Sequence, residues 1–126
     1  MGLTQELAKT VGRGRVAVDT AVFIYFIEEH DPYLPIIEPL FAEVAGGERE
    51  IVTSALTLLE VMVVPFRVGD SALAARYEAL LTRSRGLHLV DIDRNQLRAA
   101  AQLRARYGVR TPDALQLAAA LQERCS

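Results

Sequence analysis

The feature that most constrains the fold is a short apolar run that ends on an acid and a hydroxyl, Arg15-Val16-Ala17-Val18-Asp19-Thr20. A glycine- and arginine-rich turn precedes this run and an apolar, helix-like stretch follows it, which predicts a buried central strand leading into a helix. Asp19 then lies at the carboxyl end of the strand. Ligands bind beyond this end of the strands in open α/β sheets, so Asp19 is a candidate site residue. Capping of the following helix is the simpler explanation of the same residue.

The composition fits one compact domain, because the chain has 126 residues, of which 51% are hydrophobic and 24% are charged. The 14 Lys and Arg residues are balanced by 16 Asp and Glu residues, so charge alone does not indicate nucleic-acid binding. The single cysteine, Cys125, favours a reducing compartment. The longest apolar run, residues 51–66, is interrupted by Glu60 and is too short to span a bilayer. We therefore expect a cytoplasmic protein.

Strands alternate with helices along the chain. The remaining strands are expected at residues 50–53 and 87–92, and helices at 3–11, 20–28, 35–45, 70–84 and 93–107, with one more helix after Ser54 and a last one from Thr111. Pro65 is expected to bend or end the helix after Ser54. This alternation predicts an α/β fold with a mainly parallel sheet and helices on both faces.

Several helices carry recognisable start and packing signals. Asp70 and Asp93 are expected to cap their helices, and the hydroxyl of Thr111 is expected to cap the last one. Pro112 follows at a position where proline is common. The last helix is expected to pack inward through four apolar side chains, namely Ala114, Leu117, Ala118 and Leu121.

Glu60 is the most informative single residue, because residues 55–64 are otherwise apolar except for Thr57. An ionised carboxylate buried without a partner is strongly destabilising, so Glu60 needs a cation, hydrogen bonds or a proton. No lysine or arginine lies one helical turn away, at position 56, 57, 63 or 64. The alternative is that Glu60 lies on a narrow stripe that faces solvent.

A third acid, Asp113, lies at the start of the last helix, where the helix dipole alone would explain it. Asp19, Glu60 and Asp113 can nevertheless meet at one end of a sheet. Three carboxylates in one place would repel one another and take up protons unless a divalent cation lay among them. Mg²⁺ and Mn²⁺ suit such oxygen ligands, and a bound metal can activate water for attack on a phosphodiester.

Three segments carry a family resemblance: Val16–Thr20, Thr57–Val61 and Arg110–Leu121 resemble the successive acidic motifs of PIN-domain ribonucleases. They are most similar to the toxins of VapBC toxin–antitoxin modules. The resemblance covers residues 15 to 122. It implies a three-layer α/β/α PIN-like fold with a mainly parallel central sheet, and a Mg²⁺- or Mn²⁺-dependent endoribonuclease activity.

By motif, Asp19, Glu60 and Asp113 match metal-binding, catalytic acids of that family, and Thr20 matches the small hydroxyl residue beside the first acid. The resemblance also implies an RNA substrate, a cognate antitoxin that docks near the acids, and a homodimer. Family members usually continue into another strand that ends near a fourth acid. We therefore expect residues 1–126 to form a single PIN-like domain that lacks the family's last strand.

Other functions are less well supported by the residues. A metal-free ribonuclease normally needs a histidine pair, and only His30 and His88 are available. A phosphoacceptor domain would be expected to have a lysine after a late strand, whereas the sole lysine is Lys9. A catalytically silent PIN-like module that binds RNA or an antitoxin stays open. Arg94, Arg98 and Arg110 are candidate phosphate contacts, although a solvated helix face also explains such arginines.

Overall fold

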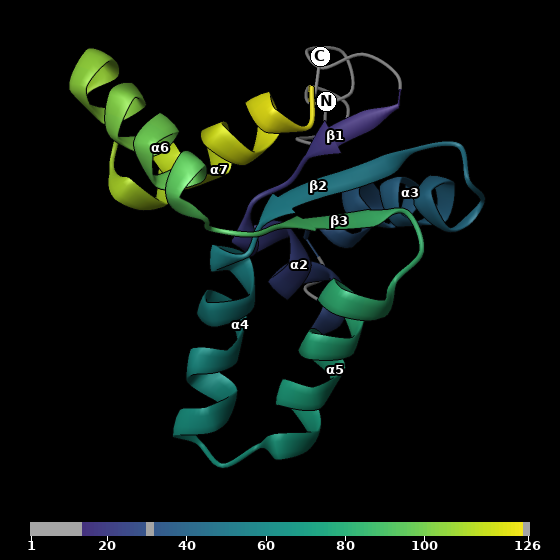
Figure 1. The fold of residues 1–126 in the computed structure, drawn as a ribbon. Helices are drawn as coiled ribbons and strands as arrows, with labels where there is room; N and C mark the ends of the chain where they lie inside the picture. The colour runs from purple at the N-terminus through teal and green to yellow at the C-terminus, as the bar shows by residue number, and fades with distance from the viewer. Residues whose placement is uncertain (1–13, 30–31, 125–126) are drawn as a thin grey trace.

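The computed structural model describes residues 14–29 and 32–124 (Figure 1). The helix expected at residues 3–11, His30 and Cys125 lie outside these described residues. Three short parallel strands form the described sheet: β1 (Arg15–Ala17), β2 (Glu50–Ser54) and β3 (Leu87–Val90). The strand order is β1-β2-β3. The prediction that the first strand is central is therefore wrong for the described sheet, in which β2 is central and β1 is an edge strand.

Helices connect and cover the strands. They are α2 (Thr20–Ile27), α3 (Leu34–Ala45), α4 (Leu56–Arg67), α5 (Ser71–Arg83), α6 (Arg94–Tyr107) and α7 (Thr111–Gln122). The third strand ends two residues earlier than expected, at Val90, and α4 continues for two residues beyond Pro65. In the described part of the chain, no helix combines the length and the apolar character that crossing a bilayer requires.

The helices lie on both faces of the sheet, which confirms the expected three-layer α/β/α fold (Figure 1). The strand register places Val16 beside Ile51 on one face, where they join a buried core formed with α2, α3, α4 and α5. Val52 and Val90 lie on the opposite face and pack against Ala119 of α7. In turn, α6 packs on the outer side of α7. Because all the strands run in one direction, the segments after β1, β2 and β3 emerge at one edge of the sheet.

The orientation of α7 differs from the expected one. Its buried residues are Ala114, Leu115, Ala118 and Ala119. Leu117 and Leu121, which were expected to face inward, are 45% and 65% exposed. The reason is that α7 lies between α6 and the sheet, so its small residues are covered from two directions. A single apolar stripe, the basis of the prediction, does not describe a helix packed on two sides.

A charge network joins the starts of the strands on the face covered by α7. Arg15 Nε donates to Glu50 Oε1 at 2.9 Å, and Arg15 Nη1 donates to the backbone carbonyl of Glu123 at 2.9 Å. His88 Nε2 lies 3.2 Å from Glu50 Oε2, in a close contact without hydrogen-bond geometry. Arg15, and after it His88, hold the pKa of Glu50 below its usual value of 4.5.

Glu50→Gln should therefore remove a pH-dependent contribution to stability. A carboxyl group with a lowered folded-state pKa stabilises the protein above the pKa of the unfolded chain, and this contribution disappears as the pH falls through the folded pKa. We expect the wild type to be more stable than Glu50→Gln at pH 7 and the difference to shrink below pH 4.5. Urea unfolding at a series of pH values measures this, with Glu48→Gln as the control. A difference that does not change with pH would contradict the assignment.

Candidate active site

Asp19 occupies the N-cap position of α2 but does not act as a cap. Its backbone is extended, with φ −89° and ψ 177°, and its side chain makes no capping hydrogen bond. Asp70 and Asp93, at the same position of α5 and α6, accept hydrogen bonds from Leu73 N at 3.0 Å and Gln96 N at 2.9 Å. The sequence predicted these two caps correctly. The exposed carboxylate of Asp19 therefore does not cap α2, although capping was the simpler explanation of this residue.

The next residue connects this strand end to Glu60. Thr20 Oγ1 donates a hydrogen bond of 2.5 Å to Glu60 Oε1. Glu60 is half-buried, and in residues 14–29 and 32–124 no arginine, lysine or histidine lies within ion-pair distance of it. This hydrogen bond keeps one oxygen of the Glu60 carboxyl group in place. The negative charge that the sequence identified therefore has a hydroxyl partner, and the described residues supply no compensating cation.

A cluster of buried polar side chains surrounds the Thr20–Glu60 pair. Thr57 is fully buried, and its Oγ1 lies 2.7 Å from Thr53 Oγ1 and 3.3 Å from Thr20 Oγ1. Gln116 of α7 donates from Nε2 to Thr57 Oγ1 at 2.9 Å, and its Oε1 accepts from the backbone N–H of Ser54 at 3.0 Å. These hydrogen bonds satisfy polar groups that would be costly to bury unpaired.

The sequence analysis did not single out Gln116. The signal that would have found it is the one that marked Glu60, a polar residue in an otherwise apolar stretch, here Ala114-Leu115-Gln116-Leu117-Ala118. Gln116 also shares with Asp19 the wall of a cavity of about 230 Å³. The other lining residues are apolar: Ala17, Val18, Val22, Leu117 and Ala120. Residues from the first and last motifs therefore lie around one cavity.

Within the described ranges, the Asp113 side chain is hydrogen-bonded to Arg110 and not to this cluster. It is in the first turn of α7, and its Oδ2 lies 3.3 Å from Arg110 Nε in an exposed ion pair. Arg110 is the N-cap residue of α7 and Thr111 is already helical, so the expected hydroxyl cap is wrong. Over the described ranges, no group of three or more His, Cys, Asp or Glu residues is arranged to hold a metal ion.

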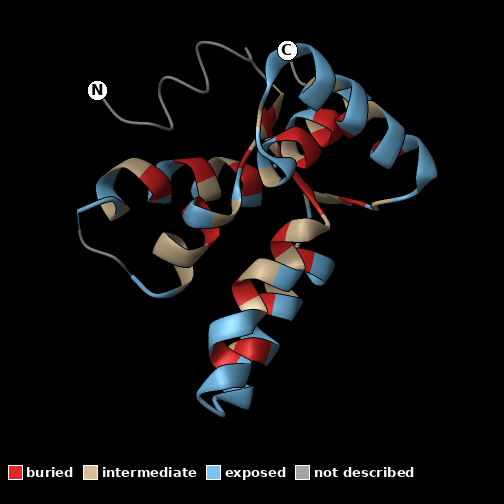
Figure 2. Ribbon diagram, turned by 90° about the vertical axis from the view of Figure 1, so that its left-hand side faces the viewer, coloured by how far each residue is buried: buried red, intermediate tan, exposed pale blue. Residues whose placement is uncertain are grey.

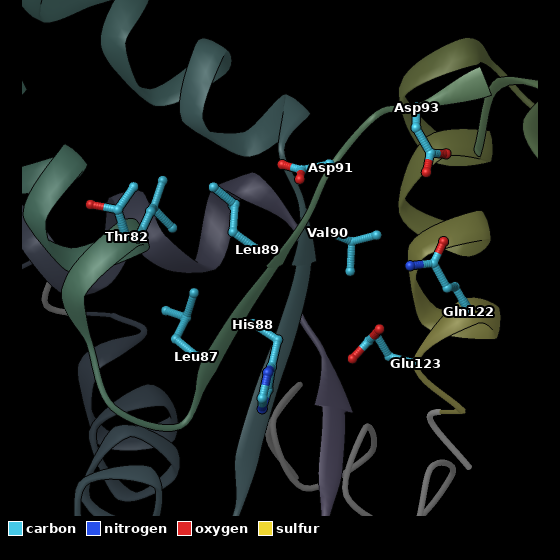
Figure 3. Close-up of a pocket in the computed structure, with 10 residues that line it drawn as sticks. Thr82, Leu87, His88, Leu89, Val90, Asp91, Asp93, Gln122 and Glu123 are labelled. Atoms are coloured by element: carbon cyan, nitrogen blue, oxygen red, sulfur yellow. The ribbon is translucent and has the colours of Figure 1, made fainter. Parts of the chain in front are cut away.

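A larger groove of about 560 Å³ lies along β3 and carries other acids (Figure 3). Asp91, Asp93 and Glu123 line it, together with His88. Figure 3 shows Asp91 pointing away from Asp93 and Glu123. These acids are therefore spread along the groove, and Asp93 is already used as a cap.

The acids at the edge of the sheet offer oxygen donors of the kind that a hard divalent cation prefers. Asp19 offers an exposed carboxylate, Glu60 offers one whose other oxygen is oriented by Thr20, and neither pairs with a cation in the described part of the chain. Mg²⁺ needs only one or two carboxylates and completes its shell with water. Such a donor set is chemically suited to Mg²⁺ or Mn²⁺.

The fold and the site together define a three-layer α/β/α domain with acids at the carboxyl edge of a parallel sheet, the edge where ligands bind in such folds. The comparison with protein families is specific: residues 16–126 match the PIN domain. The chain belongs to the PIN domain family. PIN domains are generally nucleases and typically use divalent metal ions. No curated protein and no solved structure matches the chain significantly.

The lack of a capping hydrogen bond from the Asp19 side chain can be tested by measuring stability. Asp70→Ala and Asp93→Ala each remove a capping hydrogen bond and should lower the free energy of unfolding by about 1 kcal/mol. Asp19→Ala removes no such bond, so we expect a clearly smaller loss or a slight gain. Urea unfolding of the three variants beside the wild type measures this. A loss for Asp19→Ala as large as for Asp93→Ala would show that Asp19 serves the helix.

Proposed function

We propose that this protein is a Mg²⁺- or Mn²⁺-dependent endoribonuclease that acts as the toxin of a type II toxin–antitoxin system. The observation that carries the proposal is the placement of Asp19, free of a capping role, next to the Thr20–Glu60 pair at the carboxyl edge of the sheet. Membership of the PIN domain family supports a nuclease. The toxin role rests on the resemblance of the three acidic motifs to VapBC toxins.

In the proposed mechanism, Asp19 and Glu60 hold the cation and Thr20 fixes the Glu60 oxygen that it contacts. A bound divalent ion supplies a water of lowered pKa and neutralises charge on the phosphodiester. Asp113 is the proposed third acid, and it must leave Arg110 to reach the site. That exchange is energetically small, because exposed ion pairs contribute only about 0.2–1 kcal/mol. Arg110, 81% exposed, is then available to contact an RNA phosphate.

The proposed role implies RNA as substrate, a cognate antitoxin and a second copy of the chain as partners, and a cytoplasmic location.

The exposed face of α4 supports contact with another protein. Leu59, Val63 and Phe66 lie on one face of α4, at helical positions i, i+4 and i+7, and are 62%, 40% and 62% exposed on the helical hairpin that projects from the sheet (Figure 2). Contiguous exposed apolar surface of this kind commonly marks an interface. The acid Glu60 lies on the same helix, so a protein bound there would lie close to the proposed site.

A catalytically silent module that binds RNA or an antitoxin is the second candidate. The Asp113–Arg110 ion pair favours it, because Asp113 has to give up this contact before it can bind a metal. The two candidates differ in one property: only the first one cuts RNA.

A cleavage assay on single-stranded RNA tests the proposed function. We expect the wild type to cut in the presence of Mn²⁺ and to stop when EDTA is added. Asp19→Asn should lower the rate by at least about 100-fold, since losing a direct metal ligand should exceed the 10- to 100-fold effect of losing an outer-shell partner. Asp93→Asn, a change at a helix cap, is the control and should cut like the wild type. Cutting that continues both with EDTA and in Asp19→Asn would remove the metal mechanism, and a wild type that binds RNA without cutting it would favour the silent module.

A further inference from the structure

The groove along β3 follows the open edge of the sheet (Figure 3). Its lining includes Leu87, Leu89 and Asp91 as well as His88 and Val90. Successive side chains of a strand point to opposite faces of the sheet, so a groove lined by both sets runs along the edge of the strand and not over one face. The ends of α5 and α7 border the groove on the two faces. Beyond β3, the described sheet has no further strand.

Half of the peptide groups of β3 point into this groove. The backbone N–H of Ile51 in β2 donates to Gly86 O, so Gly86 and every second residue after it turn their peptide groups towards β2. The peptide groups of Leu87 and Leu89 therefore point outward. The Leu87 N–H donates to Ser84 O at a long 3.3 Å, and Leu89 has no strand to pair with in the described sheet. Such an edge is a template for one more strand.

We propose that β3 pairs with β3 of a second copy of this chain, antiparallel and about a two-fold axis. The charges around the strand are self-complementary when the sequence is reversed, because Arg83 and Arg85 precede it and Asp91 and Asp93 follow it. If His88 lies opposite its copy, residues equally far from His88 lie opposite each other. Arg85 of each copy then faces Asp91 of the other, and both side chains are exposed in the single chain. Two-fold symmetry is the commonest symmetry of protein dimers.

The backbone and the apolar side chains favour the same register. It places Leu87 opposite Leu89 of the copy, and the outward peptide groups of these two residues can exchange both hydrogen bonds. A shift by one residue would set outward groups against groups already bonded to β2. A shift by two residues in one direction would place Asp91 opposite Leu87, and in the other direction it would place Arg85 opposite Leu89. A parallel pairing would bring like charges together.

The two charges lie on the same face of the sheet, as this pairing requires. Arg85 and Leu87 line one cavity, and Figure 3 shows Asp91 pointing to the same side of β3 as Leu87. A two-fold axis perpendicular to the sheet leaves each face on its own side, so Arg85 and Asp91 of different copies meet. Opposite charges directly across a strand pair stabilise it. On the other face His88 meets its copy, and each ring has Glu50 of its own chain 3.2 Å away to balance a proton.

The pairing leaves the candidate active site uncovered. β1 lies at the other edge of the described sheet, and Asp19 follows it. Because the copies are antiparallel, the carboxyl edges of their sheets face opposite directions. The inference therefore gives a surface to the second copy that the proposed function includes, and it does not depend on nuclease activity.

Exchanging the two charges tests the pairing by analytical ultracentrifugation over a series of concentrations. We expect the wild type to dimerise. Arg85→Asp and Asp91→Arg each bring two like-charge contacts into the dimer, so each variant alone should dimerise at least about tenfold more weakly. An equal mixture of the two variants should form a heterodimer, because every contact then joins opposite charges again. Arg98→Asp, an exposed change on α6 outside the groove, is the control and should dimerise like the wild type.

Hydrogen exchange of the Leu89 amide locates the contact. We expect this amide to be protected in the wild-type dimer and to exchange faster in Arg85→Asp. A wild type that stays monomeric at about 1 mM would overturn the inference, as would a dimer with an unprotected Leu89 amide or a mixture of the two variants that does not associate. A monomeric wild type that cuts RNA would contradict this pairing alone, and a dimer with a protected Leu89 amide that cuts no RNA would contradict the nuclease alone.

Discussion

The hydrogen bond from Thr20 to Glu60 is the interaction on which the candidate site depends. It joins the segment after β1 to the second turn of α4, two parts of the chain 40 residues apart. The parallel sheet makes this contact possible, because the ends of β1 and β2 emerge side by side and each leads into a helix. Without the contact, Glu60 would be a half-buried charge with neither an orientation nor a partner in the described part of the chain.

The fold positions this contact by packing on both sides of the sheet. The core formed with α2 to α5 fixes α2 and α4, which carry the two partners. On the other face, α7 brings Gln116 to the end of β2 through small buried residues that permit a close approach. The alanine-rich sequence of α7 thus serves the site as well as the core. An exposed leucine such as Leu117 lines the cavity beside Asp19 instead of filling the interior.

Most features determined by neighbouring residues were predictable from the sequence, although the expected cap at Thr111 was wrong, and features determined by distant contacts were not predictable. The caps at Asp70 and Asp93 were predicted correctly because a cap depends on the next three residues. The α/β class followed from the alternation of elements, and the unusual position of Glu60 from its apolar neighbours. The buried side of α7 was predicted only in part: Ala114 and Ala118 are buried as expected, but Leu117 and Leu121 are exposed, because the buried side depends on α6 and the sheet. The pairing of Thr20 with Glu60 required the sheet register, and the convergence of Asp113 with the other acids stays a prediction.

The central claim is that carboxylates at the edge of the sheet hold a divalent cation. The most direct test adds substoichiometric Mn²⁺ and measures which backbone amide NMR signals are broadened, because a paramagnetic ion broadens the signals of the residues near it. We expect the strongest broadening at Asp19, Thr20 and Glu60, with Gln116 also affected because it lines the same cavity as Asp19. Broadening centred on Asp91, Asp93 and Glu123 in the groove along β3, or uniform weak broadening over the whole protein, would contradict the account.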